Sequence, residues 1–135
     1  MFKPLRFTGA PILILSGELD EWTPAKPCVE LTEALKTAGY DAKITVYPGA
    51  YHSFDGEKPL HRIERAFNIT KCRFEIQPDG TTIEKTSGLA LDTLKNRRKA
   101  LSACSTRGVL AGRNGPAKKK AMQDMREFVT RAFGL

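Results

Sequence analysis

An acid and a histidine follow two neighbouring apolar runs, and their types and spacing are those of two parts of a catalytic triad. Asp20 lies four residues after the run PILILS at 11–16, and His52 lies five residues after the run KITVY at 43–47. If both runs are parallel strands, the loops that follow them emerge at the same edge of a sheet. A carboxylate there binds the imidazole N–H, fixes its tautomer and stabilises the imidazolium that forms when the histidine takes up a proton.

Each residue taken alone also has a plain structural interpretation. Asp20 could be a turn residue that caps the following helix, and His52 could be an ordinary loop histidine. The pair together, at consecutive strand ends, favours a catalytic origin. Glu18, Glu21 and Asp55 are alternative carboxylates for the acid but are interpreted as solvated, and His61 is interpreted as a surface residue on a short helix.

The sequence contains no residue suited to be the nucleophile. A nucleophile elbow needs the pattern G-x-S-x-G or its cysteine variant, because small residues relieve the strain of a sharp strand-to-helix turn. None of the serines and cysteines has a glycine both two residues before it and two residues after it: Ser16, Ser53, Ser87, Ser102, Ser105, Cys28, Cys72 and Cys104. We therefore expect the attacking group to come from polypeptide outside this chain.

The first half of the chain reads as strand, helix, strand. The run at 11–16 is typical of a strand buried on both faces. A helix is predicted over 24–38, with Thr23 as N-cap, Pro24 as first helical residue and Gly39 at its end. Cys28 falls on the apolar side of this helix. A second strand at 43–47 follows, and the short connections predict a parallel pair joined by a right-handed crossover.

The second half has a different character. We predict a short helix at 59–67, a hairpin at 71–85 with its turn at 78–80, a helix at 90–104 and a Gly-rich loop at 105–115. The last helix, predicted at 116–133, carries an apolar face that we expect to be buried: Ala121, Met122, Met125, Phe128, Val129, Ala132 and Phe133.

A resemblance to a known family rests on the segment from Ala10 to Asp55. Its strand, the G-x-x-D of residues 17–20, the helix opening near a proline, the Y-P-G of residues 47–49 and the H-x-F of residues 52–54 resemble the C-terminal third of the dienelactone hydrolase family of α/β-hydrolases. The resemblance implies an α/β fold, more narrowly a partial α/β-hydrolase fold made of the C-terminal parallel strands and helices. It also implies Asp20 as triad acid and His52 as general base.

The same resemblance sets the expected organisation and activity. Residues 1–135 are interpreted as one C-terminal portion of an α/β-hydrolase domain, and 56–115, with a hairpin and a helix, as an insertion atypical of the family. The implied activity is hydrolysis of a small ester or lactone through a serine or cysteine nucleophile, with the chain inactive alone. Trp22 and Phe54 are candidate walls of the substrate pocket, although Trp22 could instead pack under the loop. No metal and no cofactor are implied.

A sheet of two parallel strands leaves an apolar edge open, so we expect self-association or pairing with the missing N-terminal portion. The competing hypothesis is a non-catalytic interaction module. Residues 1–57 carry 5 Lys and Arg against 8 Asp and Glu, whereas 58–135 carry 17 against 7. A basic half could bind an acidic partner or nucleic acid. Nucleic acid is disfavoured, because no aromatic residues interleave with the basic runs to stack bases.

Cysteine usage and apolar runs bear on the compartment without fixing it. No run is long enough to span a membrane. Residues 1–17 are read as leading into a strand and not as a signal peptide, because Pro4, Arg6 and Thr8 interrupt them. The cysteine spacing fits no zinc site. Cys72 and Cys104 could form a disulfide, in which case export is possible; otherwise a cytoplasmic location is the default.

Overall fold

The computed structural model describes residues 8–135 and has mixed α/β content. The start of the segment considered as a signal peptide lies outside the described residues. The strands are β1 (Ile12–Gly17), β2 (Ala42–Tyr47), β3 (His61–Asn68), β4 (Phe74–Ile76), β5 (Thr82–Glu84), β6 (Leu89–Ala90) and β7 (Thr106–Ala111). The helices are α1 (Ala25–Thr37), α2 (Leu94–Cys104) and α3 (Gly115–Phe133).

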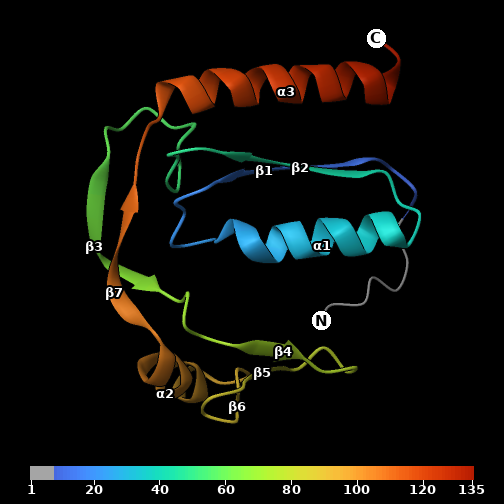
Figure 1. Ribbon diagram of the computed structural model, residues 1–135. Coiled ribbons are helices and arrows are strands. Elements are labelled where there is room, and N and C mark those ends of the chain that lie inside the picture. Colours follow the sequence, from blue (N-terminus) through green and yellow to red (C-terminus); the bar gives the residue numbers. More distant parts are fainter. Residues whose placement is uncertain (1–7) are drawn as a thin grey trace.

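Strands β1 and β2 lie between helices α1 and α3, as Figure 1 shows. The two strands pair in parallel with Ile12 opposite Ala42 and Gly17 opposite Tyr47. This confirms the predicted strand–helix–strand unit with a parallel pair. Among the described residues the sheet has only these two strands. The edge of β1 away from β2 therefore has no partner strand in this part of the chain.

The start of α1 differs from the prediction by one residue, and the difference matters for the site. Pro24 occupies the N-cap position, and no side chain caps the helix. The predicted cap, Thr23, lies one position earlier, where its hydroxyl binds Asp20 instead. A side-chain cap stabilises a helix by about 0.5–2 kcal/mol, so α1 forgoes that contribution. Gly39, with φ of +86°, follows the helix end as predicted.

Two predictions for the second half were wrong, and both concern one pair of strands. Residues 59–67 are not a helix, because β3 pairs antiparallel with β7, and 105–115 are not all loop, because β7 occupies most of them. The Arg, Glu and Ala residues of β3 are good helix formers. A ladder formed with residues some 45 positions later overrides that local preference. Together β3 and β7 form a two-stranded arm that leads away from the layers (Figure 1).

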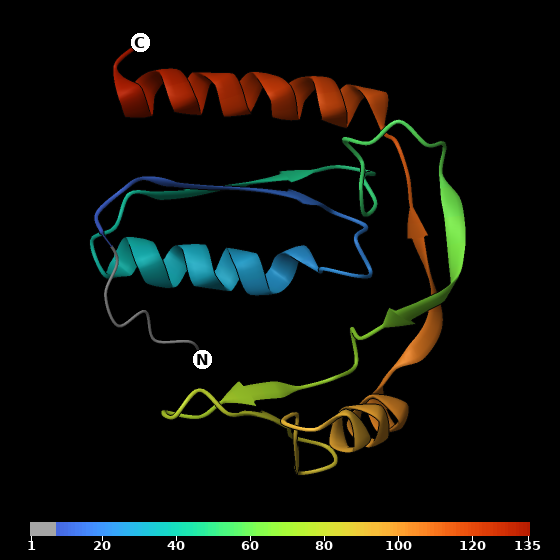
Figure 2. The same cartoon turned by 180° about the vertical axis from the view of Figure 1, so that it is seen from behind.

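A small module stands at the far end of the arm, as the view from behind also shows (Figure 2). The predicted hairpin is confirmed as β4 and β5, and β6 adds a short third strand. Helix α2 begins at Leu94, later than predicted, because the Thr93 hydroxyl accepts the Asn96 amide and caps it. A disulfide joins Cys72 to Cys104, as the sequence suggested, and Cys28 is free and half-buried on α1.

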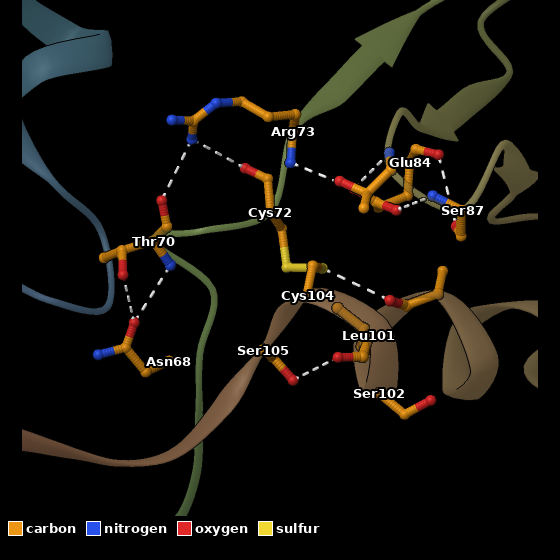
Figure 3. Close-up of a disulfide and its surroundings, with 12 residues drawn as sticks. Asn68, Thr70, Cys72, Arg73, Glu84, Ser87, Leu101, Ser102, Cys104 and Ser105 are labelled. Atoms are coloured by element: carbon orange, nitrogen blue, oxygen red, sulfur yellow. Dashed lines mark hydrogen bonds between the residues drawn. A yellow bond between two sulfur atoms is a disulfide. The ribbon is translucent and has the colours of Figure 1, made fainter.

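A buried carboxylate organises the same module beside the disulfide (Figure 3). Glu84 has no exposed surface, and its oxygens accept the backbone N–H groups of Ser87 at 2.7 Å, Thr86 at 3.1 Å and Arg73 at 3.4 Å. Burial alone would raise the pKa of Glu84, but these donors outweigh it and lower the pKa to about 2. Glu84 therefore ties the loop after β5 to the start of β4 as an ionised group.

Helix α3 begins as the sequence indicates, but its apolar face is largely uncovered. The Asn114 side chain caps it, and Pro116 lies in its first turn. The buried residues are Ala117, Ala121 and Asp124. Of the face predicted to be buried, only Ala121 is fully so. Phe128 is half-buried and Ala132 is exposed. The following side chains, which we call the α3 stripe, are between 38% and 76% exposed: Met122, Met125, Val129 and Phe133.

The core lies between the sheet and α3, directly behind the loop that carries His52. Tyr47, Ala50 and Phe54 pack against Ala117 and Ala121 of α3. The Tyr47 hydroxyl also donates to Asp124 at 2.8 Å, which anchors α3 to the end of β2. The α3 stripe is exposed because the two described strands are too few to cover the whole helix. None of the helices within 8–135 is long and apolar enough to cross a membrane.

Candidate active site

Asp20 and His52 meet beyond the carboxyl ends of β1 and β2. The Nδ1 atom of His52 lies 3.0 Å from Oδ2 of Asp20. The Asp20 side chain is 8% exposed, whereas the His52 side chain is 30% exposed. The acid is therefore shielded from water, and the histidine remains reachable from one side. This is the arrangement by which a carboxylate orients an imidazole for proton transfer.

The carboxylate of Asp20 is fixed by its own turn. Its Oδ1 atom accepts the backbone N–H groups of Trp22 and Thr23, each at 2.8 Å, and its Oδ2 atom accepts the Thr23 hydroxyl at 2.8 Å. Burial alone would raise the pKa of Asp20. The hydrogen bonds from Thr23, His52 and Trp22 outweigh burial and hold that pKa below its usual value. Asp20 is consequently ionised at neutral pH.

Thr23 is a site residue that sequence reasoning placed in the wrong role. Its hydroxyl oxygen lies 3.3 Å from Nδ1 of His52 as well as 2.8 Å from Asp20. A threonine before a proline at the start of a helical pattern indicates an N-cap, and nothing in that local pattern points to His52. Only its position three residues after Asp20 could have suggested a shared turn.

The two strand-end loops are locked together by backbone contacts. The Leu19 amide donates to the Ala50 carbonyl at 2.9 Å, and Oε2 of Glu18 accepts the Gly49 amide at 2.8 Å. A Cβ added at Gly17 would lie 2.4 Å from the Ala50 oxygen, so only glycine permits this approach. Glu18, interpreted from the sequence as merely solvated, therefore helps to join the Asp20 loop to the His52 loop.

The segment that follows β7 also holds the His52 loop. The Gly112 amide donates to the His52 carbonyl at 2.8 Å, and the Asn114 amide donates to the Phe54 carbonyl at 2.9 Å. Ser53 between them has φ of +56°, an uncommon conformation for a residue other than glycine. These contacts join positions about 60 apart in sequence, and no local pattern in either segment predicts them.

A cleft of about 330 Å³ lies in front of the pair. Its walls come from the end of β1, the two loops that carry Asp20 and His52, and helix α3: Leu15, Ser16, Gly17, Asp20, Thr23, His52, Ser53, Phe54, Asp55, Ala121, Met122 and Met125. The cleft thus has one wall that carries charge and one that is apolar, and the last residues of β1 form part of its lining.

The two residues proposed to wall the substrate pocket occupy different places. Trp22 is half-buried and packs on the His52 ring, with ring centroids 4.8 Å apart, and it is not among the residues that line the cleft. Phe54 is 8% exposed, packs against Tyr47 and contributes to the cleft lining. A role for either in substrate contact stays a prediction.

The other carboxylates and the second histidine considered from the sequence form no hydrogen bond or ion pair with Asp20 or His52 among the described residues. Asp55 is exposed at the cleft, and Glu21 is exposed beside the Asp20 turn. His61 is exposed on β3, not on a helix, and its Nδ1 atom lies 2.9 Å from the Pro59 oxygen. Within the described part of the chain, no group of three or more His, Cys, Asp or Glu side chains is placed to hold a metal ion.

Comparison with known proteins gives a match over the segment that carries Asp20 and His52. The pattern that defines the dienelactone hydrolase family matches residues 6–72, which include β1, α1, β2, Asp20 and His52. Through this segment the chain belongs to the dienelactone hydrolase family. A putative carboxymethylenebutenolidase from Yersinia pestis is 40% identical over 58 residues, which cover 42% of this chain and 22% of that protein. The chain thus spans about a fifth of the length of this curated relative.

The match to the dienelactone hydrolase family covers only the first half of the chain. The matched residues take in the Asp20 turn, the His52 loop and the first strand of the arm, and they end at Cys72. The family match does not extend to most of the distal module, to β7 or to α3. No solved structure matches the chain significantly.

Proposed function

We propose that this chain is the acid–histidine half of a dienelactone hydrolase-like enzyme that hydrolyses a small ester or lactone. The observation that carries the proposal is the 3.0 Å contact between Nδ1 of His52 and the carboxylate of Asp20, at the ends of two parallel strands and beside a cleft. The family match over 6–72 supports hydrolysis as the kind of reaction.

In this mechanism His52 acts as general base and Asp20 stays ionised. With Nδ1–H bound to Asp20, the other nitrogen of His52 takes the proton from a serine or cysteine that attacks the substrate carbonyl. His52 then gives that proton to the leaving alcohol, or to the ring-opened alkoxide of a lactone. In the second half-reaction His52 takes a proton from the water that attacks the acyl-enzyme carbonyl, and returns it to the serine or cysteine as the acyl bond breaks. The chain supplies the base and its orienting acid, and we propose that it is inactive alone.

The nucleophile must reach the cleft from polypeptide that pairs with this surface. The free edge of β1 is a template for another strand, and the α3 stripe beside it exposes Met122 and Met125 at 39% each. A strand added next to β1 would bury both and close the cleft. This supports a partial α/β-hydrolase fold that is completed by strands from other polypeptide or, without them, occupied by a second copy of the chain.

An ester-hydrolysis assay tests the catalytic proposal. The purified chain, and the chain mixed with a fragment of the Yersinia pestis relative that lacks the aligned segment, are compared on p-nitrophenyl butyrate and on a five-membered lactone. We expect hydrolysis in the mixture alone, and its loss with His52→Gln. Hydrolysis by the chain alone, hydrolysis unaffected by His52→Gln, or an inactive mixture whose two parts bind each other, each contradicts the proposal.

Light scattering with size-exclusion chromatography tests the proposed surface. We expect the wild-type chain to self-associate and Met125→Lys to shift it to monomer, since a charge in the α3 stripe opposes burial. Gln123→Lys is the matched control, because Gln123 is exposed on the same helix outside the α3 stripe and receives the same charge. A wild-type chain that stays monomeric at all concentrations argues against self-association through this surface.

The competing interaction-module function has one favourable observation. Lys95, Arg98 and Lys99 lie on one face of α2, are exposed, and form no ion pair within residues 8–135. Such a face suits an acidic protein partner. Binding of heparin as an acidic probe, and its loss in the triple charge-reversal variant and at high salt, would favour this function. Equal retention of the variant and the wild type would count against it.

A further inference from the structure

The hydroxyl of Thr23 lies between the acid and the histidine. Its oxygen is 2.8 Å from Oδ2 of Asp20 and 3.3 Å from Nδ1 of His52, while those two atoms are 3.0 Å apart. The backbone N–H of the same residue donates to the other carboxylate oxygen at 2.8 Å. Thr23 therefore touches both members of the pair, and the turn that carries it also carries Asp20.

The protons in this triangle can be arranged in only one way that satisfies all three groups. An ionised carboxylate only accepts, so the single hydroxyl proton of Thr23 points to Asp20. The lone pairs of the hydroxyl oxygen are then left to face His52. Both neighbours of Nδ1 are acceptors, so Nδ1 carries a proton that is shared between the Asp20 carboxylate and the Thr23 hydroxyl.

We propose that Thr23 is a positioning residue, which holds the Asp20 carboxylate and the His52 ring in one geometry and keeps His52 as its Nδ1–H tautomer. This tautomer leaves the other ring nitrogen with its lone pair, as a general base requires. The catalytic consequence rests on the proposed hydrolase function. The tautomer itself is a property of this chain and is testable without any activity.

A second observation separates this role from helix capping. Helix α1 starts one residue later than a Thr23 cap would place it, and no side chain caps it. The Thr23 hydroxyl therefore does not cap the helix and instead contacts Asp20 and His52. Trp22 completes the enclosure by packing on the His52 ring with centroids 4.8 Å apart.

The exposure of Thr23 to solvent determines which substitution removes its contacts most completely. Because its side chain is exposed, a water molecule can take the place of the hydroxyl in Thr23→Ala. Thr23→Val keeps the shape but fills the space with a methyl group that can neither donate nor accept. Thr23→Ser restores the hydroxyl. The proposal therefore predicts the largest effect for valine, a smaller one for alanine and near-complete rescue by serine.

The direct test is NMR of the imidazole nitrogens in the isotopically labelled chain at a pH where His52 is neutral. We expect the wild type to show the Nδ1–H tautomer with a slowly exchanging proton. In Thr23→Val that proton should exchange about tenfold faster or more, as expected for the loss of one hydrogen bond to a charged group, and the other tautomer should gain population. His61, exposed on β3, is the internal control and should not change.

The outcomes separate this proposal from the hydrolase function. Proton exchange and tautomer in Thr23→Val within about twofold of the wild type would overturn the positioning role. Amide spectra check that each variant is folded. In the mixture with the Yersinia pestis fragment, Thr23→Val should lower kcat with little change in KM, and Thr23→Ser should restore it. An inactive mixture whose two parts bind each other refutes the hydrolase function and leaves the NMR result to decide the positioning role.

Discussion

The carbonyl oxygen of His52 accepts a hydrogen bond from the amide of Gly112 at 2.8 Å. Gly112 follows β7, so the backbone of His52 is held by a segment that comes 60 residues later in the chain. Two residues on, the Asn114 amide binds the Phe54 carbonyl, and the Asn114 side chain binds the Gly49 carbonyl at 3.1 Å. The geometry of the His52 loop therefore depends on the arm, which local sequence around His52 does not encode.

Replacing Gly112 should displace the His52 loop. Gly112 has φ of +150°, and a Cβ there would lie 2.5 Å from the Leu60 Cα. Gly112→Ala should therefore lower the free energy of unfolding by about 1–3 kcal/mol, the usual cost of strained backbone and overpacking, and should shift the amide resonances of residues 51–55. Urea unfolding and NMR measure the two effects. Gly115→Ala is the control, because nothing lies within 4 Å of a Cβ there and Gly115 is helical.

Asp20→Asn should leave the fold intact and give the wrong tautomer of His52. The asparagine oxygen can still accept the turn amides, but its NH₂ group then faces Nδ1 of His52 as a donor. Where this exchange has been made in a catalytic triad, kcat falls on the order of 10⁴-fold, and we expect a similar loss in the complemented enzyme. Nitrogen NMR of the isolated chain checks the tautomer directly. Glu21→Gln, a neighbouring exposed carboxylate, should change neither measurement.

Breaking the disulfide should loosen the distal module and spare the layers. Cys72 and Cys104 are 32 positions apart, for which loop closure predicts a loss of about 3–4 kcal/mol in the free energy of unfolding. Cys104→Ser should raise amide exchange across β4, β5 and α2 while β1, β2 and α1 keep theirs. Cys28→Ser, at the free and half-buried cysteine, is the control. If the bridge is found in the chain isolated from its source, an oxidising compartment is favoured.

The distal module should lose stability in acid through Glu84. Its pKa is about 2 in the folded chain against 4.5 for the ordinary carboxyl, so the ionised form stabilises the fold fully above about pH 4.5. That contribution falls as the pH drops from about 4.5 toward 2. Urea unfolding and amide exchange at Ser87 should show this slope, and Glu84→Gln should flatten it. Glu75→Gln removes an exposed carboxylate on the neighbouring strand, and the slope should persist there. The same slope in wild type and Glu84→Gln would show that another group is responsible.

The sequence predicted the parts of the fold that depend on short stretches. Local sequence is sufficient to predict the strand β1 from its apolar run, the end of α1 from Gly39 and the turn at residues 78–80. Each of these elements appears where it was expected. The predicted helix at 59–67 failed because local helix preference in β3 competes with a ladder to β7, and a ladder is decided by its distant partner. The predicted burial of the α3 stripe was wrong for a related reason. Periodicity identifies an apolar face of a helix, but the number of neighbouring strands decides whether that face is covered.

By itself the sequence determined which groups are available for chemistry: a carboxylate and an imidazole at consecutive strand ends, and no nucleophile elbow. Type and spacing suffice for that, because the parallel crossover brings successive strand ends to one edge. Only the tertiary structure decided how the pair is held. In the folded chain the Thr23 hydroxyl contacts Asp20 and His52 and does not cap the helix, and the Gly112 amide binds the His52 carbonyl. Hydrogen bonds act over about 3 Å whatever the separation along the chain, so contacts between distant segments have no signature in either segment alone.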